Sequence, residues 1–302
     1  MMKVKALIIG CGNIGSQYDL NNSLIQTHSK AMFLSDWINE VDVFDLNTQI
    51  TSELSQKYNF GILKKYNSNN LHNYDIISIC TPTETHYKFL KDCILQKVKL
   101  VICEKPISFS QNELTKLLSL YNESSTKVLV NYYRRFQKPY NKLKEKIHLF
   151  SSDLSFVNIK YYKGVLNYAS HAMDLINFII NKSLKIEMLN VLSRNFDYFK
   201  KDPTIIANFN SNGVEYLLNG VSSEIPVLDI ELIFKNKKVF IFDLGNKANI
   251  YEGDILVESF DSMIDNYMLD VFEHAKSIFL NEIKIDNFKE SLILNKQLLY
   301  TI

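Results

Sequence analysis

The sequence predicts an α/β protein in which an N-terminal doubly wound parallel sheet precedes an α+β domain with a mainly antiparallel sheet. Three observations support this fold class. Short apolar runs alternate with longer amphipathic stretches in the first 130 residues, and a glycine-rich loop directly follows the first run. After residue 131, strand-like segments follow one another without helices between them. At about 100–200 residues per domain, 302 residues suffice for two domains, which we place at 1–131 and 132–302.

The apolar runs of the first domain are rich in β-branched residues and have the length of strands. Such continuous runs are typical of parallel strands that helices cover on both faces, with right-handed crossovers. The predicted strands are Val4–Ile9, Val41–Phe44, Ile76–Cys80, Val98–Cys103 and Val128–Val130. The predicted helices are Thr27–Ile38, Thr48–Tyr58, Glu84–Leu95 and Gln111–Glu123.

The second domain begins with a basic, aromatic stretch over Tyr132–Ile147. Consecutive strands without intervening helices indicate an antiparallel sheet. The predicted strands are Phe156–Tyr162, Ile186–Leu192, Thr204–Phe209, Val214–Asn219, Leu228–Phe234 and Lys238–Phe242, and the predicted helices are His171–Ile180, Ile264–Asn281 and Phe288–Leu299. Helices on one face leave the other face of this sheet to be covered, which predicts a homodimer or homotetramer.

The composition argues against several classes of protein. The 34 Lys and Arg residues balance 33 Asp and Glu residues, and this net charge of +1 does not suit binding to nucleic acid or to an anionic membrane surface. No apolar stretch approaches the roughly 18 residues of a membrane span, and the run after Lys5 is too short for a signal peptide. Four cysteines without C-x-x-C spacing predict buried, reduced thiols in a cytoplasmic protein and no metal site.

The segment Gly10-Cys11-Gly12-Asn13-Ile14-Gly15 fits the pattern G-x-G-x-x-G directly after the first predicted strand. In this pattern the first glycine permits a tight turn, and the second lets the backbone approach a pyrophosphate. The third allows a helix to pack closely on the strand, and the N–H groups of the helix N-terminus attract the anion. The loop therefore predicts a dinucleotide site of the Rossmann type, with Gly10, Gly12, Asn13, Ile14 and Gly15 as cofactor-binding residues.

An acidic residue at the end of the second strand completes this prediction. Asp45 ends Val41–Asp45 and would accept hydrogen bonds from the adenosine ribose, with Asp42 as the competing candidate. Asp45 lies farther from the glycine loop than is usual, which a loop over Gln17–Gln26 before a helix capped by Thr27 would explain. No Lys or Arg occurs in Leu46-Asn47-Thr48, directly after Asp45, to neutralise a 2′-phosphate, so NAD is favoured over NADP.

Two further segments follow predicted strands, at the edge where an open α/β sheet binds ligands. One contains Cys80-Thr81-Pro82-Thr83 and His86, and the other is Cys103-Glu104-Lys105-Pro106. Together with the glycine loop, and in this order, they resemble the glucose–fructose oxidoreductase/inositol dehydrogenase/MocA family. The resemblance extends over the whole chain and is strongest at residues 1–136 and 161–180.

The resemblance implies NAD(P)-dependent redox chemistry at a carbinol carbon, usually of a sugar, cyclitol or nucleotide sugar. It implies that Lys105 reaches the reacting hydroxyl and that the Lys105–Pro106 bond is often cis. It places the cofactor beside the residues at the strand ends, which are Cys80, Thr81, Pro82, Thr83, His86, Glu104 and Lys105. A lysine suits this chemistry because desolvation lowers its pKa readily, so that it can transfer a proton.

The segment Asn167–Asp174 resembles the family pattern D-x-G-x-H-x-x-D, which it matches at His171 and Asp174. His171, close to a helix N-terminus, would be neutral and could act as the general base. Asp174 would orient it or bind substrate hydroxyls. Asn167 stands where Asp is usual and cannot accept a proton, so either Lys105 and His171 carry the proton chemistry or the substrate differs.

The neighbourhood of Asn167 bears on the substrate. The N-x-x-S-H pattern of Asn167, Ser170 and His171, beside Tyr161-Tyr162-Lys163-Gly164, resembles the branch of the family found in bacterial surface-polysaccharide biosynthesis, which suggests a nucleotide sugar. Tyr133 and Arg135 are further substrate-binding candidates, since an arginine suits a diphosphate, although this basic run is equally consistent with a solvated face.

The predicted activity is hydride transfer between nicotinamide and such a carbinol carbon, with Lys105 and His171 as catalytic residues. Two alternatives stay open. One is a redox-neutral NAD-dependent glycosidase, and the other is a non-catalytic relative that senses a dinucleotide.

Overall fold

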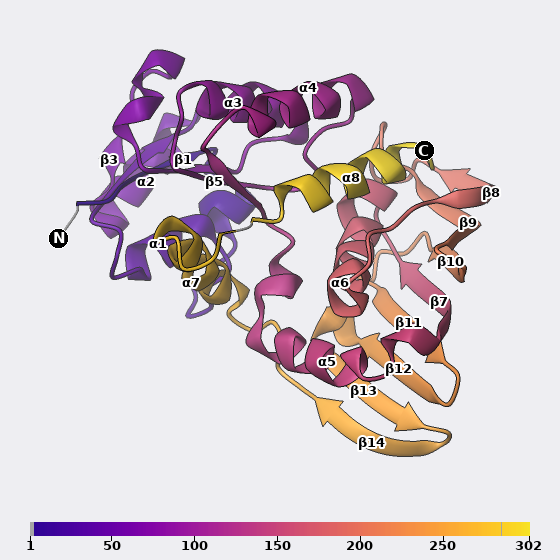
Figure 1. Cartoon of the computed structure of the whole chain (residues 1–302). Helices are drawn as coiled ribbons and strands as arrows, with labels where there is room; N and C mark the ends of the chain where they lie inside the picture. The colour runs from indigo at the N-terminus through magenta and orange to yellow at the C-terminus, as the bar shows by residue number, and fades with distance from the viewer. Residues whose placement is uncertain (1–2, 285) are drawn as a thin grey trace. The chain divides into compact units, whose positions relative to one another are not determined.

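The computed structural model describes residues 3–284 and 286–302 of the chain (Figure 1). It divides into two compact units. The first unit contains the chain up to Tyr133 together with Asn266–Leu292, and the second contains Arg134–Asp265 and Ile293–Ile302. The sequence analysis places one boundary, between residues 131 and 132. The structure divides the chain differently, because Asn266–Leu292 returns to the first unit.

The first unit contains a six-stranded sheet whose apolar strands pair in parallel throughout. Its order β3-β2-β1-β4-β5-β6 reverses direction between β1 and β4, which confirms the doubly wound fold. In such a fold, ligands bind at the carboxyl ends of the strands where the order reverses. The strands are β1 (Lys5–Ile9), β2 (Glu40–Phe44), β3 (Gly61–Ile62), β4 (Ile76–Ile79), β5 (Leu100–Cys103) and β6 (Lys127–Val130).

Helices cover both faces of this sheet, with α3 and α4 on one face and α1 and α7 on the other (Figure 1). Thr27 caps the first helix through its side chain, as predicted, although that helix ends at Leu34 rather than at Ile38. The Asp19 carboxylate anchors the loop before it by accepting hydrogen bonds from the Thr27 N–H and hydroxyl at 2.9 and 2.7 Å. The helices are α1 (His28–Leu34), α2 (Thr48–Tyr58), α3 (Thr83–Leu95), α4 (Gln111–Asn122) and α7 (Tyr267–Phe279).

Segment 266–292 belongs to the first unit because its side chains pack into that unit. Phe272 lies 5.9 Å from the ring of His28, edge to face. The side chain of Asn287 exchanges two hydrogen bonds with the backbone of Val130, at 2.8 and 2.9 Å, and so satisfies the last residue of the edge strand β6.

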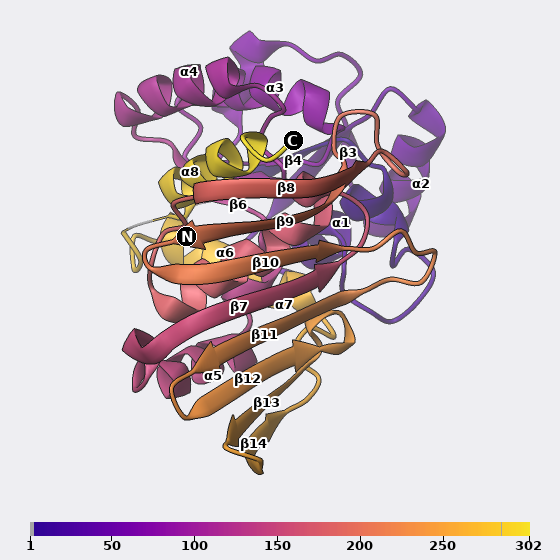
Figure 2. The same cartoon turned by 90° about the vertical axis from the view of Figure 1, so that its right-hand side faces the viewer.

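The second unit contains an eight-stranded sheet in the order β14-β13-β12-β11-β7-β10-β9-β8, which Figure 2 shows from its broad face. The pair β7 and β10 is parallel and the other pairs are antiparallel, so the prediction of a mainly antiparallel sheet is confirmed. The strands are β7 (Leu154–Tyr161), β8 (Glu187–Asn195), β9 (Thr204–Ser211), β10 (Val214–Gly220), β11 (Leu228–Phe234), β12 (Lys237–Phe242), β13 (Lys247–Glu252) and β14 (Ile255–Phe260).

The remaining helices are α5 (Lys138–His148), α6 (Ser170–Ile180) and α8 (Phe288–Leu299). The first of them lies in the stretch that the sequence analysis treated only as basic and aromatic. Its buried residues Tyr140, Leu143 and Ile147 recur at helical spacing between exposed lysines. Among the residues that the structure describes, no helix has both the length and the apolarity needed to cross a bilayer.

Candidate functional site

The glycine loop has the backbone that its sequence pattern requires. Gly10 adopts a φ of 90°, a region that side-chain-bearing residues rarely occupy. A Cβ on Gly15 would lie 2.3 Å from the carbonyl oxygen of Gly10, so only glycine allows this close packing. The loop leads into a single helical turn over Asn13–Gln17, and the next helix, α1, begins at His28 after the loop that the sequence analysis expects over Gln17–Gln26.

A cavity of about 720 Å³ opens beside this loop, at the carboxyl ends of β1, β2 and β4. A Cβ on Gly12 would meet no atom within 4 Å, so the missing side chain leaves space within the cavity rather than space filled by protein. Because a dinucleotide needs this close approach to the backbone, the residues present fit such a cofactor. The lining residues are Gly10, Gly12, Asn13, Ile14, Tyr18, Phe44, Asp45, Leu46, Tyr66, Cys80, Thr81, Pro82, Thr85, Lys88 and Phe89.

Asp45 stands at the end of β2 and lines this cavity, as the sequence analysis predicts for the ribose-binding residue. Its carboxylate accepts hydrogen bonds from the N–H of Cys11 at 2.7 Å and of Asn47 at 2.8 Å, which fix it against the glycine loop. The competing Asp42 does not line the cavity. It pairs with Lys5 at 2.9 Å and accepts a hydrogen bond from the Tyr74 hydroxyl at 2.8 Å.

The segment after β4 divides between the cavity and the interior. Cys80, Thr81 and Pro82 line the cavity, whereas Thr83 begins α3. His86 is buried, and its ring nitrogens lie 2.8 Å from the Pro106 carbonyl and 2.7 Å from the Thr81 carbonyl. Burial lowers the pKa of His86, although the hydrogen bonds to these carbonyls oppose the shift. The ring therefore ties the two strand-end segments together.

Glu104, at the end of β5, belongs to a buried polar network that the sequence analysis did not identify. Its Oε1 lies 3.0 Å from Nε2 of His28 and accepts a hydrogen bond from Nδ2 of Asn131 at 2.6 Å. The other ring nitrogen of His28 lies 3.0 Å from the Ser78 hydroxyl. Burial raises the pKa of Glu104, but the hydrogen bonds from His28 and Asn131 and the electrostatic attraction of His28 and Lys105 lower it more, so the net shift is downward.

Lys105 follows this anchored carboxylate, and its peptide bond to Pro106 is cis, as the resemblance implies. The Glu104 network thus holds the backbone on the N-terminal side of Lys105, and His86 holds the carbonyl of Pro106 on the other side. Signals for this arrangement exist in the sequence, because His28 directly follows the helix cap Thr27 and Asn131 directly follows a strand. Only the fold, however, brings them to Glu104.

In the second unit, Asp202 holds the turn that precedes α6. Its carboxylate accepts hydrogen bonds from the N–H groups of Leu166 at 2.8 Å and Asn167 at 2.9 Å. It also accepts one from the Asn167 side-chain amide at 3.2 Å. Gly164 has a φ of 87°, and a Cβ there would lie 2.3 Å from the same carboxylate. A carboxylate therefore does lie beside position 167, but residue 202 supplies it.

His171 lies in the first turn of α6 and is largely buried. The ring of Tyr168 lies 6.4 Å away, edge to face, and Tyr162 packs on Tyr168 with ring centroids 4.4 Å apart. These rings form an aromatic wall beside His171. Tyrosine faces and hydroxyls suit a sugar ring, which has both apolar C–H groups and polar hydroxyls.

Two predicted substrate-binding residues contact each other. Nε of Arg135 donates a hydrogen bond to Asp174 at 2.9 Å, and both side chains are buried. The structure thus brings Arg135, Asp174 and His171 into the second unit. Tyr133 belongs to the first unit, where its ring stacks on Tyr267 at 4.2 Å.

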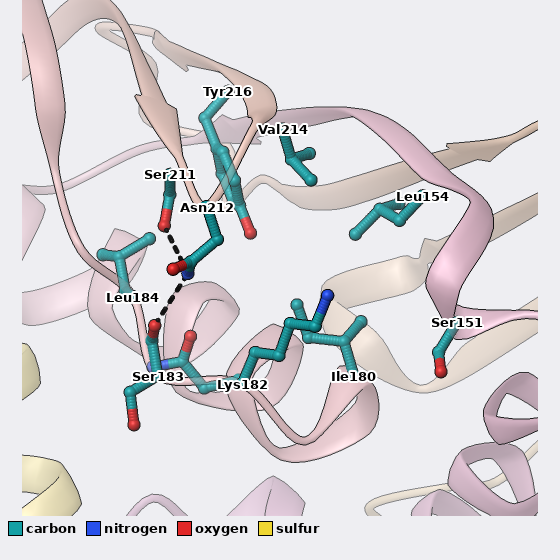
Figure 3. A pocket seen from close by; sticks show the side chains of 11 residues that line it. Ser151, Leu154, Ile180, Lys182, Ser183, Leu184, Ser211, Asn212, Val214 and Tyr216 are labelled. Atoms are coloured by element: carbon teal, nitrogen blue, oxygen red, sulfur yellow. Dashed lines mark hydrogen bonds between the residues drawn. The ribbon is translucent and has the colours of Figure 1, made fainter.

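A second cavity, in the second unit, lies between the end of α6 and the hairpin of β9 and β10. In Figure 3 the side-chain amide of Asn212 bonds to Ser183 and Ser211 at its edge. Its volume of about 10 Å³ leaves room for about one water molecule, so a sugar does not fit there.

The four cysteines Cys11, Cys80, Cys93 and Cys103 are buried and form no disulfide. Burial and the nearby Asp45 raise the pKa of Cys11 to about 12, which keeps its thiol protonated. Within the described ranges 3–284 and 286–302, no group of three or more His, Cys, Asp or Glu side chains is arranged to hold a metal ion.

Several known proteins are similar to this chain in sequence. Residues 4–132 match a family model described as an oxidoreductase family with an NAD-binding Rossmann fold. The chain is 30% identical over 270 residues to the uncharacterized oxidoreductase YrbE of Bacillus subtilis, covering 84% of this chain and 70% of that protein. It is 24% identical over 140 residues to a myo-inositol 2-dehydrogenase of Thermotoga maritima, covering 46% and 39% of the two chains.

Solved structures show the same fold over the whole chain. The UDP-N-acetylglucosamine 3-dehydrogenase GnnA of Acidithiobacillus ferrooxidans superposes with a TM-score of 0.78 at 14% identity, covering 100% of this chain and 97% of that one. KijD10, a 3-ketoreductase of Actinomadura kijaniata in complex with NADP and TDP-benzene, superposes with a TM-score of 0.79 at 10% identity and the same coverage. Both units therefore have the arrangement of strands and helices found in these enzymes.

Proposed function

The chain belongs to the glucose–fructose oxidoreductase/inositol dehydrogenase/MocA family of NAD(P)-binding oxidoreductases, and from this premise we propose that it is an NAD-dependent dehydrogenase or reductase acting on a sugar or nucleotide sugar. The observation that supports the proposal best is the cavity beside Gly12, which Asp45 also lines. Its backbone approach and its acidic residue suit the pyrophosphate and the ribose of a dinucleotide.

The residues of the first unit hold the cofactor in this proposal. The glycine loop approaches the pyrophosphate, Asp45 accepts hydrogen bonds from the adenosine ribose, and Cys80, Thr81 and Pro82 contact the cofactor at the end of β4. The nicotinamide, when bound, supplies the site of hydride gain or loss. His86 and Glu104 hold the backbone on both sides of Lys105.

We assign proton transfer to Lys105 and His171. An ammonium group at the reacting hydroxyl can donate a hydrogen bond to an alkoxide or exchange a proton with it, and a neutral imidazole can accept that proton. Lys105 belongs to the first unit and His171 to the second, so each assignment is tested by its own variants. Asn167 would bind a substrate hydroxyl while Asp202 holds its amide.

The remaining substrate contacts are proposed for Asp174, Arg135 and Tyr133. Since Arg135 and Asp174 already form an ion pair, a substrate would meet them as one unit rather than as separate groups. Arg135 could then donate its other N–H groups to a diphosphate, because a guanidinium carries five N–H bonds.

A nucleotide sugar is the substrate class that we favour. The fold is shared with an enzyme named for UDP-N-acetylglucosamine and with one bound to TDP-benzene. The aromatic wall of Tyr162 and Tyr168 beside His171 suits a sugar ring. A role in surface-polysaccharide biosynthesis would fit such a substrate. Balanced charge and four unpaired, buried thiols are consistent with a cytoplasmic enzyme.

The test begins with mass spectrometry of ligands that co-purify with the protein, followed by absorbance assays of nicotinamide reduction with nucleotide sugars and cyclitols. We expect bound NAD and turnover with at least one nucleotide sugar. Lys105→Ala should abolish turnover while NAD still binds, and near-full activity would exclude Lys105 from the mechanism. Turnover without any net change in nicotinamide absorbance would instead identify the redox-neutral glycosidase.

A further inference from the structure

Lys88, on the second turn of α3, lines the same cavity as Asp45. Among the described residues that line this cavity, Asp45 and Lys88 are the two that carry a charge. The sequence favours NAD because no Lys or Arg occurs in the three positions directly after Asp45. The fold supplies one from a helix more than forty positions later.

Aromatic rings hold the Lys88 ammonium in place. Its Nζ lies 5.3 Å from the ring centroid of Tyr66 and 5.5 Å from that of Phe89, both of which also line the cavity. Such cation–π contacts stabilise an ammonium group over an aromatic face without neutralising its charge. Lys88 is exposed, and its ammonium group lies over two rings that line the cavity, so it adds a positive charge at the cavity's edge.

The ring of Tyr66 connects Lys88 with the end of β2. Its hydroxyl donates a hydrogen bond to Asp92 at 2.8 Å, and its ring packs 5.9 Å from Phe44, the residue before Asp45. Phe89 also contacts Tyr66, edge to face, at 5.0 Å. Through Tyr66, Lys88 is thus connected to Phe44, the neighbour of Asp45, and both charged residues line the same cavity.

The Asp45 carboxylate already accepts two hydrogen bonds from the protein backbone. Its two carboxylate oxygens each accept one backbone N–H, from Cys11 and Asn47. A carboxylate has about four acceptor positions, so Asp45 can still accept a hydrogen bond from a ribose hydroxyl. The two N–H groups also weaken the repulsion that a carboxylate exerts on a nearby phosphate.

We propose that Lys88 compensates for Asp45 at the adenosine end of the cavity, so that this chain binds NADP as well as NAD. Asp45 serves the ribose hydroxyls of NAD, and Lys88 pairs with the 2′-phosphate of NADP. This inference deepens the proposed function, because it rests on a dinucleotide occupying the cavity.

The test measures dissociation constants for NAD and NADP by titration calorimetry on the full chain, without any need for the sugar substrate. In Lys88→Gln we expect the ratio of the NADP constant to the NAD constant to rise at least about tenfold, because only NADP carries the phosphate that meets the lost charge. NAD affinity should change less than about threefold, and this also shows that the cavity stays folded. Lys88→Arg should retain the wild-type ratio.

Lys91→Gln is the matched control, since Lys91 lies one turn away on the same helix, over Tyr87, and does not line the cavity. It should leave the ratio unchanged. The proposal is overturned if the ratio of the two dissociation constants rises less than tenfold in Lys88→Gln. This includes the case in which both constants rise by the same factor, because Lys88 would then contact the adenine that both cofactors share. If neither dinucleotide binds to the wild-type chain, the proposed function fails as well. If NAD binds and the ratio does not move, the proposed function stands.

Discussion

The partnership of His28 with Glu104 predicts how the stability of the protein changes in acid. Burial raises the pKa of Glu104, but the hydrogen bonds from His28 and Asn131 and the electrostatic attraction of His28 and Lys105 outweigh it, so the pKa lies below its usual 4.5. A carboxyl with a lowered folded pKa stabilises the fold above its unfolded pKa, and this contribution disappears as the pH falls through the folded value.

In His28→Gln the Glu104 carboxylate loses the imidazole that lies 3.0 Å from its Oε1, and its pKa rises. We expect the variant to lose about 2 kcal/mol at neutral pH and to unfold in acid at a higher pH than the wild type. Urea denaturation followed by circular dichroism, from neutral pH to about pH 3.5, measures both. Ser78→Ala touches the other ring nitrogen of His28 and should shift the acid midpoint less. Equal midpoints in His28→Gln and wild type would contradict this role.

The contact between Asn167 and Asp202 contains one negative charge, that of Asp202. A second carboxylate at position 167 would therefore be unfavourable. The Asn167 amide donates to Asp202 at 3.2 Å, whereas Asn167→Asp would place two carboxylates at that separation. We expect this variant to lose about 2 kcal/mol near pH 8, and less near pH 5 where one carboxylate takes up a proton. Thermal unfolding at the two pH values measures the difference.

The exchanged pair Asn167→Asp with Asp202→Asn provides the control. It restores one carboxylate and one amide, so its loss of stability should be smaller than the sum of the two single losses, by about 1 kcal/mol or more. Strict additivity of the two single variants would show that the contact between Asn167 and Asp202 carries no energy.

Single residues were predictable from the sequence where a local pattern requires them. Gly10, Gly15 and Asp45 fall into this class, because a turn, a close packing and a strand end each restrict the residue type within a few positions. His28 and Asp202 were not, since their partners Glu104 and Asn167 lie 76 and 35 positions away. Pairing over such distances depends on the fold and leaves no local pattern.

At the scale of an element, the glycine loop separates a folding role from a binding role. In Gly15→Ala the new methyl group would lie 2.3 Å from the Gly10 carbonyl oxygen, and we expect a loss of about 2–3 kcal/mol. In Gly12→Ala the methyl group would enter open space, so stability should change by less than about 0.5 kcal/mol.

The dissociation constant for NAD should change more in Gly12→Ala than in Gly15→Ala, which is the reverse of the order expected for stability. The Gly12→Ala methyl group occupies space that a pyrophosphate needs, so we expect the dissociation constant for NAD to rise at least about tenfold. Calorimetric titration with NAD, together with thermal unfolding without it, measures the two effects separately. Unchanged NAD affinity in Gly12→Ala would exclude the loop as the pyrophosphate site.

Whole elements were predicted well where apolar residues are continuous or alternate regularly. The strand Leu228–Phe234 has the predicted bounds, and its burial alternates strictly. The helix α5 and the hairpin of β13 and β14 were missed, because lysines and polar residues interrupt their apolar patterns. The hairpin turns at Gly253, where φ is positive, yet a single glycine between polar residues is a weak signal in a sequence.

At the scale of the whole molecule, the eight-stranded sheet predicts self-association. On β12, Val239 and Ile241 are buried, whereas the half-exposed Phe240 and Phe242 alternate with them and stack at 5.1 Å on the other face. Charged residues of both signs lie on that face, where Asp229 on β11 is directly opposite Lys160 on β7. Aromatic rings among charges of both signs suit contact with an identical surface turned by a twofold axis.

We therefore expect the wild-type chain to be a dimer or tetramer at micromolar concentration, measured by light scattering after size-exclusion chromatography. Phe240→Glu should reduce the assembly by burying an unpaired charge at the interface, with the fold retained because residue 240 is half-exposed in the single chain. Phe196→Glu, at an exposed aromatic that follows β8 at the opposite edge of the sheet order from β14, should leave the assembly intact. A wild-type monomer, or a Phe240→Glu variant with unchanged mass, would mean that this sheet face is open to solvent in the working enzyme.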